Sequence, residues 1–543
     1  MKVETVMDMA LGTHMGSSMP EARAAIFSMR RRPATRRERV AAVPLAVILT
    51  LLPAGACAQQ TDAGERSGRA VSIMPRVSLS ETLTDNVNLT QSGRQSDQIT
   101  EIRPGIQIDM NGTRVKGYLD YALNGIFYAQ NSSARRTEHA LSTFATIEAV
   151  EDWAFLDVSG SISQGQVSAF GTPSMGSTAI NANRTEVSSY RISPYLRGEL
   201  GGLVSYEARY SRSETNSGAA SSSDVSTIDA NFSLAGKSAS RNLGWSADAT
   251  RQQIDFEAGR PTQADRLNLG LSYFVTPQLN VAAQAGREAH NYTTVDKQSH
   301  GTSGFGVSWV PSQNTRFSAS WDRRSFANLH RVSFERRTAR TVWKFIDSRD
   351  VSVTPNQTSL GSRGSIFDLL FNQFASIEPN EAARADLVNT FLRTNGLDPD
   401  VIVVNNFLRS VAALQRRQDL SFALLGVRDT ITAVATRSES SRLDTLSRGV
   451  DDLTAADLVR QRGVSINYTH RLTPAYSLGV LLSQQKTTGQ STSQETRLRF
   501  INASVTGKVG RNATVSLGVR RAVSRGTSSY SENAISGNLT MRF

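Results

Sequence analysis

The last residues of the chain alternate strictly between apolar and polar side chains. One parity holds Ile535, Gly537, Leu539, Met541 and Phe543, and the other holds Ser536, Asn538, Thr540 and Arg542. A period of two is the pattern of a β-strand, because successive side chains of a strand point to opposite faces. The segment is therefore predicted to be a strand with one apolar and one polar face, which limits the fold to one that covers the apolar face.

The same alternation recurs from about residue 71 to the C-terminus. Examples are residues 115–127, 204–210, 228–234, 267–273, 476–482 and 513–519. Each segment has about 9 to 12 residues, which is the length that a tilted strand needs to cross a bilayer. We therefore predict an all-β fold for residues 71–543, namely a transmembrane antiparallel outer-membrane β-barrel. A soluble all-β array or adhesin is the alternative.

The connections between these segments alternate between short and long. Short ones lie at Glu151-Asp152, Gly201-Gly202, Thr276-Pro277 and Thr473-Pro474, and long polar ones at 164–184, 213–224, 286–303, 439–461 and 484–494. Short turns on the periplasmic side and long loops outside are typical of a transmembrane barrel. Aromatic residues near the strand ends are expected to form interfacial girdles; they are Trp153, Tyr273, Phe274, Trp309 and Tyr476.

The number of strands follows from counting the alternating segments and from the closure of the barrel. Counting the alternating segments gives about 21, but a closed antiparallel barrel with both termini in the periplasm needs an even number. The pattern is weakest at residues 330–430. We predict about 16 to 20 strands.

Residues 356–416 interrupt the β pattern and are predicted to form a helical insert. Ile366, Leu369 and Leu370 follow helical spacing, and a second helix fits from Asn380 to a stop at Asn395-Gly396. The insert could enter the lumen as a plug or sit at a mouth as a docking element. Its apolar side chains favour the mouth, with the helices packed on each other, and a decoration without a gating role is the third possibility.

Residues 1–58 have the order of a secretory signal region. An arginine-rich run at 30–39 precedes an apolar stretch at 40–52 and then Ala56-Cys57-Ala58. Translation is expected to begin near Met29, and residues 59–70 are expected to be a short linker. Cys57 either leaves with the signal or, in a lipoprotein, carries the lipid. It is the only cysteine, so no disulfide framework is expected.

The formal net charge of +12 comes mainly from arginines that are dispersed along the chain. Because no compact basic stripe forms, we expect no nucleic-acid partner. Charges within the alternating segments are expected to face the lumen, since a charged side chain facing lipid is costly. They are Arg191, Arg197, Glu207, Arg209, Asp229, Asp248, Arg266, Arg520 and Arg542.

No catalytic, cofactor-binding or metal-binding residues are predicted, and the chain is not expected to be an enzyme. There is no nucleophile elbow, phosphate-binding loop or cysteine nucleophile. His290 and His300 are neighbours at a spacing that matches no compact metal motif. Both are expected to be solvated histidines in a surface loop.

Four stretches carry a family resemblance: 77–89 (VSLSETLTDNVNL), 103–106 (RPGI), 365–370 (SIFDLL) and 423–430 (ALLGVRDT). The chain resembles the outer-membrane proteins associated with the PEP-CTERM exopolysaccharide and protein-sorting system of Gram-negative bacteria. The resemblance covers essentially the whole mature chain. It implies a non-catalytic barrel for exopolysaccharide export or surface assembly, with exopolysaccharide and periplasmic export proteins as partners. A general diffusion porin or uptake channel is the alternative function.

The terminal aromatic residue has a resemblance of its own. A strand ending in Phe543 resembles the closing strand of bacterial outer-membrane barrels, which the barrel assembly machinery reads. We therefore expect export through a cleaved signal peptide and insertion into the lipid of the Gram-negative outer membrane.

Overall fold

The computed structural model describes residues 70–219, 224–237, 242–257, 259–352, 407–444, 446, 451–491, 494–510 and 512–543. The chain divides into Met1–Glu65 and Arg66–Phe543, and the described residues all belong to the second unit. The predicted signal region, the start at Met29 and the fate of Cys57 lie outside the described residues, as does the linker 59–70 except for its last residue.

The second unit is built almost entirely from β-strands. The strands are β1 (Val71–Thr84), β2 (Asp97–Asn111), β3 (Val115–Tyr128), β4 (Arg136–Val150), β5 (Ala154–Gln166), β6 (Arg184–Leu200), β7 (Val204–Ser217), β8 (Val225–Lys237), β9 (Leu243–Phe256), β10 (Thr262–Thr276), β11 (Leu279–His290), β12 (Gln298–Ser312), β13 (Thr315–Arg323), β14 (Asn328–Arg337), β15 (Thr341–Ser352), β16 (Ala413–Leu425), β17 (Asp429–Arg442), β18 (Leu458–Arg471), β19 (Tyr476–Thr488), β20 (Glu495–Val509), β21 (Ala513–Gly526) and β22 (Tyr530–Arg542).

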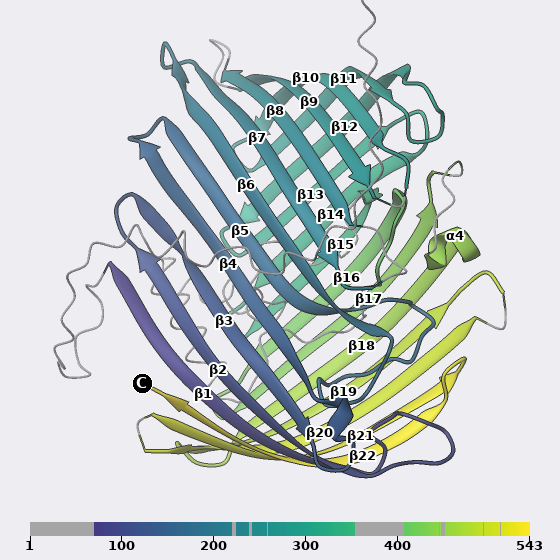
Figure 1. The fold of residues 1–543 in the computed structure, drawn as a ribbon. Helices are drawn as coiled ribbons and strands as arrows, with labels where there is room; N and C mark the ends of the chain where they lie inside the picture. The colour runs from purple at the N-terminus through teal and green to yellow at the C-terminus, as the bar shows by residue number, and fades with distance from the viewer. Residues whose placement is uncertain are drawn as a thin grey trace, which may run out of the picture. The chain divides into compact units, whose positions relative to one another are not determined.

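Each strand pairs antiparallel with the next one along the chain, and the ring closes between the first and last strands. β1 pairs with β22 in a continuous register from Arg76↔Arg542 to Thr84↔Ala534. Figure 1 shows β1 beside the strand that leads to the C-terminus. Closure satisfies the backbone hydrogen bonds of both terminal strands, which is the condition for a sheet to stand in lipid.

The described residues contain 22 strands, so the predicted range of 16 to 20 is wrong. Two short strands lie at or just before the region 330–430, where the pattern is weakest. β13 and β14 are only 9 and 10 residues long. β14 also carries polar side chains on both faces, such as Arg331 and His330. A strand with two polar faces has no alternation for the sequence to reveal.

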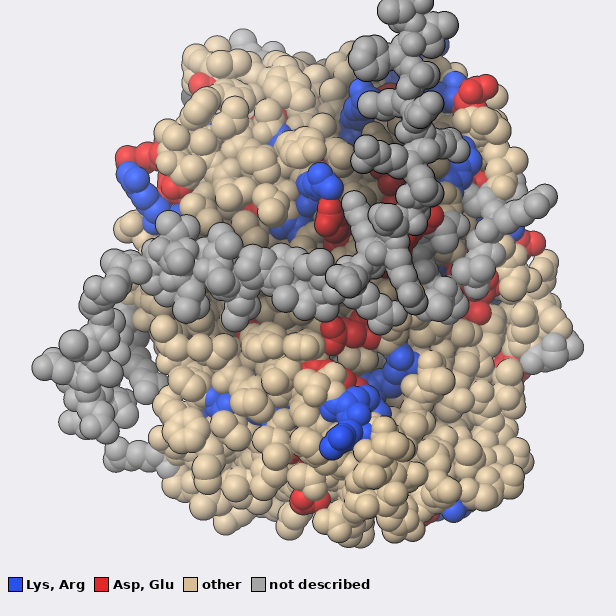
Figure 2. Space-filling model, viewed as in Figure 1, with Lys and Arg blue, Asp and Glu red and all other residues tan. Residues whose placement is uncertain are grey.

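The exposed face of the sheet is apolar and the opposite face is polar. In β10, the side chains of Leu267, Leu269 and Leu271 are 53%, 61% and 59% exposed, whereas Asn268 between them is 8% exposed. On the visible surface, charged residues occupy a minor part and uncharged residues the rest (Figure 2). An apolar outer face on a closed sheet is the arrangement that lipid requires. The chain is an outer-membrane β-barrel.

The two ends of the barrel differ as the sequence predicts. The four short turns join β4 to β5, β6 to β7, β10 to β11 and β18 to β19, all at one end. The five predicted girdle aromatics are exposed at this same end; they are Trp153, Tyr273, Phe274, Trp309 and Tyr476. Following the usual orientation of such barrels, we call this end periplasmic and the end with the long loops extracellular.

The long loops are shorter than expected because the strands extend beyond the apolar band. The loop predicted at 439–461, for example, runs only from residue 443 to 457 between β17 and β18. Past the band, outward positions hold charged residues such as Arg460 and Arg462 in β18. The backbone hydrogen bonds between the strands continue there, although the alternation of apolar and polar side chains has ended.

Helical structure in the described residues is confined to two short pieces, η1 (Ser132–Ala134) and α4 (Asp452–Ala456). No helix in this part of the chain has the length and apolar character needed to cross a membrane. Most of the helical insert predicted at 356–416 lies outside the described residues. Its C-terminal boundary is wrong, since β16 begins at Ala413. Polar residues on both faces of this strand, from Gln415 to Asp419, hide its start in the sequence.

Candidate functional site at the extracellular mouth

The nine charged residues predicted for the lumen all lie on the inward face. Each has the parity opposite to the exposed apolar residues of its strand. Several take part in ion pairs along the inner wall: Arg209 with Asp157 at 2.7 Å and Arg520 with Glu532 at 2.8 Å. Arg266 approaches Asp322 at 3.7 Å. The inner wall is thus polar and carries both signs of charge.

The loop between β5 and β6, residues 167–183, folds inward at the extracellular end and lies against the inner wall. The Tyr530 hydroxyl donates to the Pro173 carbonyl at 2.6 Å, and the Tyr128 hydroxyl donates to the Thr178 carbonyl at 3.0 Å. Both tyrosines are inward-facing and buried. The loop is therefore held by β3 and β22, which lie on the part of the ring that precedes its own strands.

Charged side chains of the inner wall also hold this loop. Arg520 donates to the Thr178 hydroxyl at 2.8 Å, and the Ser177 hydroxyl donates to Glu101 at 2.7 Å. Arg136 donates to the Ser177 carbonyl at 2.5 Å. These bonds use wall charges as partners for the loop backbone, and hydrogen bonds to charged groups are among the stronger ones.

The first turn of the same loop reaches the opposite side of the ring. Gln166, at the end of β5, forms a parallel bridge with Phe407, and the Leu408 amide donates to the Gln166 carbonyl at 3.0 Å. Phe407 belongs to the segment that leads into β16. In a ring of 22 strands, β16 lies directly opposite β5. Contacts at this point therefore span the mouth.

Asp452 in α4 is the polar centre of this crossing. Its carboxylate accepts from the Ser168 hydroxyl at 3.0 Å and from the Ala169 amide at 2.5 Å. Burial raises the pKa of Asp452, and repulsion from Asp451 adds to the effect, while the bonds from Ala169 and Ser168 lower it in part. The carboxylate thus binds the loop at a cost in desolvation.

An apolar cluster surrounds this polar contact; we call it the mouth cluster. It consists of buried residues from the β5–β6 loop, the segment before β16, and α4 with the start of β18: Ala169, Phe170, Phe407, Val411, Ala413, Leu453, Ala456 and Val459. Its members come from opposite walls, so opening the mouth would expose their side chains to water. Exposing apolar area costs about 25 cal/mol per Å², so the mouth cluster stabilises the closed arrangement of the loops. We therefore call this cluster, with the contacts of Ser168 and Ala169 to Asp452, the latch.

Two further contacts brace the loops around the mouth cluster. Arg260, in the β9–β10 loop, forms an ion pair with Asp444 at 3.3 Å. It also donates to the Asn291 carbonyl at 2.6 Å. Loops from β9–β12 and from β17–β18 are therefore joined by one guanidinium.

Arg409 is buried beside the mouth cluster in the segment before β16. It donates to the Ser352 hydroxyl at 2.8 Å. Burial lowers the pKa of Arg409 to about 10, and nearby Asp451 opposes this shift. Arg409 therefore remains cationic at neutral pH, and Asp451 supplies a compensating negative charge.

The β1–β2 loop, residues 85–96, completes the inward-folded set. The Ile180 amide donates to the Val87 carbonyl at 2.9 Å, which ties this loop to the β5–β6 loop. Val87 packs with Ile99, Ile126 and Tyr128 in a buried cluster on the inner wall. The two loops therefore form one continuous lining over β1–β3.

The prediction that His290 and His300 lie in a surface loop is wrong, and His290 is not solvated, whereas His300 is exposed. They lie in β11 and β12, and their ring centroids are 6.1 Å apart. His290 is buried, stacks on Tyr292, and meets the edge of Phe326. The strand extension beyond the apolar band explains the error. Among the described residues, no group of three or more His, Cys, Asp or Glu side chains could hold a metal ion.

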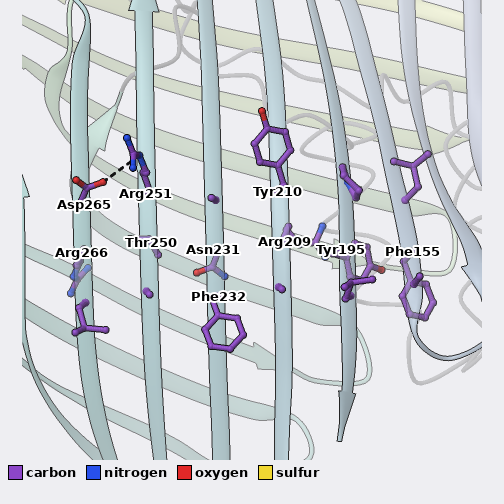
Figure 3. A pocket seen from close by; sticks show the side chains of 18 of the residues that line it. Phe155, Tyr195, Arg209, Tyr210, Asn231, Phe232, Thr250, Arg251, Asp265 and Arg266 are labelled. Carbon is purple, nitrogen blue, oxygen red and sulfur yellow. Dashed lines mark ion pairs between the residues drawn. The ribbon is translucent and has the colours of Figure 1, made fainter.

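A groove of about 1080 Å³ lies on the outer wall. Figure 3 shows its residues on the neighbouring strands β5–β10. Ala208, Ala230 and Ala249 form a shallow floor between the outward rings of Tyr210 and Phe232. Arg251 pairs with Asp265 at 3.7 Å at its edge. The groove faces lipid, so it is separate from the lumen and the mouth.

Sequence reasoning located the lumen charges but missed the mouth. Ser168, Phe407 and Asp452 lie in segments without period, and nothing in the sequence pairs residues so far apart. One available signal was Asp451 followed by Thr454, the spacing of a helix N-cap. This spacing predicts the start of α4 but does not indicate that Asp452 binds the β5–β6 loop.

No protein-family model matches this sequence, and no curated protein matches it either. Solved structures similar to this chain include the FrpB iron transporter (F5-1 variant) from Neisseria meningitidis, with 11% identity and a TM-score of 0.47 over 87% of this chain and 82% of that one. The siderophore receptor PirA from Pseudomonas aeruginosa shows 9% identity and a TM-score of 0.41 over 86% and 80%.

A second siderophore receptor, PirA from Acinetobacter baumannii, shows 10% identity and a TM-score of 0.44, covering 88% of this chain and 81% of that one. At such low identities, the binding or transport of iron and siderophores is said of those receptors and is not carried over to this chain.

Proposed function

We propose that this barrel serves export or surface assembly of exopolysaccharide in a PEP-CTERM-type system, without catalysis, and that its extracellular loops control passage through the lumen. The resemblance in residues 77–89, 103–106, 365–370 and 423–430 supports the exopolysaccharide role. The polar, mixed-charge inner wall suits a hydrated polymer, because hydroxyl groups can exchange hydrogen bonds with it.

The observation that carries the gating part is the crossing of the mouth by the β5–β6 loop. Gln166 and Asp452 tie this loop to the opposite wall, and the mouth cluster covers the contact. A wide barrel that stayed open would breach the permeability barrier of the outer membrane. A latch that opens when polymer or a partner engages would prevent this.

The orientation of the barrel supports a proposal about its partners. We propose that periplasmic export proteins dock at the short-turn end and that growing polysaccharide leaves at the mouth. Recognition of the strand that ends in Phe543 by the barrel assembly machinery belongs to the same proposal.

Single-channel conductance of the refolded mature barrel in planar bilayers tests the gate. Replacing residues 167–180 by a short glycine-serine linker removes Ser168, Ala169 and Phe170 from the latch. Conductance is expected to rise because the mouth loses the side-chain bond to Asp452 and part of the mouth cluster. The matched control is Asp457→Asn, at an exposed site next to α4, which should leave conductance unchanged. Equal conductance in the wild type and the linker variant would exclude a gating role for the loop.

A deletion strain tests the exopolysaccharide role separately. Surface polysaccharide should fall in quantity or chain length and should return when the wild-type gene is restored. Normal polysaccharide in the deletion strain, together with a conductance that depends on the latch, would favour the alternative function of a diffusion porin or uptake channel. The inward-folded loop is the observation that favours that alternative, since a loop in the lumen can set a size limit for small solutes.

A second deletion addresses the predicted insert. Conductance that rises when residues 356–406 are removed would assign these residues to the gate. An unchanged conductance would make them peripheral to it.

A further inference from the structure

Five basic residues form a straight row across the outer wall of β17–β21. Strand register places each directly opposite the next: Arg437↔Arg462, Arg462↔Lys486, Lys486↔Arg497 and Arg497↔Arg525. Like charges directly opposite each other on neighbouring strands destabilise a sheet. Nothing in the barrel fold requires such a row, so its presence calls for an anionic partner.

The row lies just beyond the apolar band at the extracellular end. In β18, Arg462 shares the outward face with Val464, which is 48% exposed and two residues nearer the bilayer centre. Leu482 in β19 and Ile501 in β20 are exposed on the same face and paired with each other, four residues nearer the bilayer centre than Lys486 and Arg497. Two residues of a strand span about 7 Å. The row is therefore at the depth of lipid head groups in the outer leaflet.

Acidic residues compensate the row only in part. Glu439 lies 2.6 Å from Arg437, and Glu495 lies 2.9 Å from Lys486 and 3.6 Å from Arg497. Among the described residues, Arg462 and Arg525 make no ion pair. Five cations thus share two carboxylates.

The opposite wall is different at the same level. There Arg212 pairs with Glu214 at 2.7 Å, and Asp265 takes both Arg251 at 3.7 Å and Lys297 at 2.7 Å. In the strand register, none of these cations stands directly opposite another cation: Arg212 is opposite Ile228, and Arg251 is opposite Asp265. The row on β17–β21 is accordingly a local feature and not a general charge of the rim.

We propose that the row Arg437–Arg462–Lys486–Arg497–Arg525 binds the phosphates of a multiply phosphorylated, multiply acylated glycolipid of the outer leaflet, whose acyl chains lie on the apolar band below. Guanidinium groups bind phosphate oxygens in pairs, and adjacent cations can share one phosphate. A lipid with two phosphates fits a row of several strands better than a lipid with one.

The depth of the row favours lipid over an acidic polysaccharide. A polysaccharide leaving the lumen would meet the loops and the inner wall first. The row faces outward and borders the band, where a lipid phosphate is held by its own acyl chains.

The test compares two triple variants of the full mature barrel in detergent. One neutralises the row (Arg462→Gln, Lys486→Gln and Arg525→Gln). The control neutralises three outward cations elsewhere (Arg212→Gln, Arg287→Gln and Arg323→Gln). The probe is bisphosphorylated lipid A, titrated by native mass spectrometry at two salt concentrations, with phosphatidylethanolamine as the reference lipid. Cell-surface polysaccharide from the same bacterium is titrated in parallel.

We expect the wild type to bind lipid A saturably and more tightly than phosphatidylethanolamine. Affinity should fall about tenfold or more in the row variant and less than about twofold in the control, since basic side chains near a membrane surface contribute additively. An equal loss in both variants would overturn the proposal in favour of net charge. Loss of polysaccharide binding alone would overturn it in favour of a polymer site.

A stability measurement keeps the test valid if the row variant folds differently. Because the row repels itself, the lipid-free row variant should melt at the same temperature as the wild type or higher. Added lipid A should raise the melting temperature of the wild type and leave that of the row variant unchanged. A row variant that melts lower without lipid would show that the row is structural, which contradicts the proposal.

Discussion

Asp452 binds a chain segment that is 283 residues away, and it does so at a buried position. The Ala169 amide and the Ser168 hydroxyl stabilise the ionised carboxylate, but burial outweighs them and raises its pKa. When the mouth opens, water would hydrate the carboxylate and its pKa would return to about 4. Ionisation of Asp452 therefore weakens the closed mouth relative to the open one.

This linkage predicts a pH dependence of opening. Protonated Asp452 favours the closed mouth, so closure is strongest below about pH 4 and weakens as the pH rises through the raised pKa of Asp452. Open probability in planar bilayers should accordingly be lower at pH 4 than at pH 7. Asp452→Asn should remove this component of the pH dependence, while Asp457→Asn should keep it. An unchanged pH profile in Asp452→Asn would assign the dependence to another group.

Gly526 has a backbone that requires glycine. Its φ is +108°, and a Cβ there would overlap the Glu495 carbonyl oxygen, which accepts a hydrogen bond from Thr527. Gly526→Ala should lower the free energy of unfolding by about 1–3 kcal/mol. Thermal unfolding followed by the loss of β circular dichroism measures this. Gly301→Ala is the control, since nothing lies near its Cβ position, and a similar loss in both variants would refute the explanation.

At the scale of the element, β21 has one face toward lipid and the other toward the water of the lumen. Leu517 is 65% exposed on the outer face, while Ser516 faces inward between Thr506 and Asn538. The two residues are neighbours in sequence and lie on opposite sides of the wall. Placing the same side chain at each of the two positions therefore compares lipid with water as its surroundings.

Leu517→Arg should destabilise the barrel in lipid by about 2–4 kcal/mol, because the guanidinium would lie within the hydrocarbon. Ser516→Arg places the same side chain on the polar face and should cost much less. Unfolding by denaturant from lipid vesicles gives both values. Equal costs would mean that the assignment of the outer face is wrong.

The strands also show what the sequence reveals and what it hides. Within the apolar band, alternation located β3, β7, β8, β10, β19, β21 and β22 correctly, because lipid on one side and water on the other force period two. Beyond the band both faces meet water, so the period disappears although the hydrogen bonds continue. The overlong predicted loops have this cause, whereas the underestimated strand number comes from short strands such as β14, which carries polar residues on both faces.

At the scale of the whole molecule, the sequence predicted the class of fold, the polarity of the two ends and the sign of each face. It did not predict the mouth. Lumen charges such as Arg520 follow from a local rule, whereas the contact between Gln166 and Phe407 depends on which strands stand opposite each other in the ring. Which strands stand opposite each other can be predicted only when the number of strands is known.

The tyrosine that holds the β5–β6 loop has a consequence for the order of assembly. Tyr530 lies in the last strand, 357 residues after its partner Pro173. If the strands are inserted in chain order from either end, most of the wall must be built before Tyr530 and Pro173 are both present. The bond between this loop and β22 therefore forms only when both distant parts of the wall are in place, so this one contact reports on the assembly of the barrel.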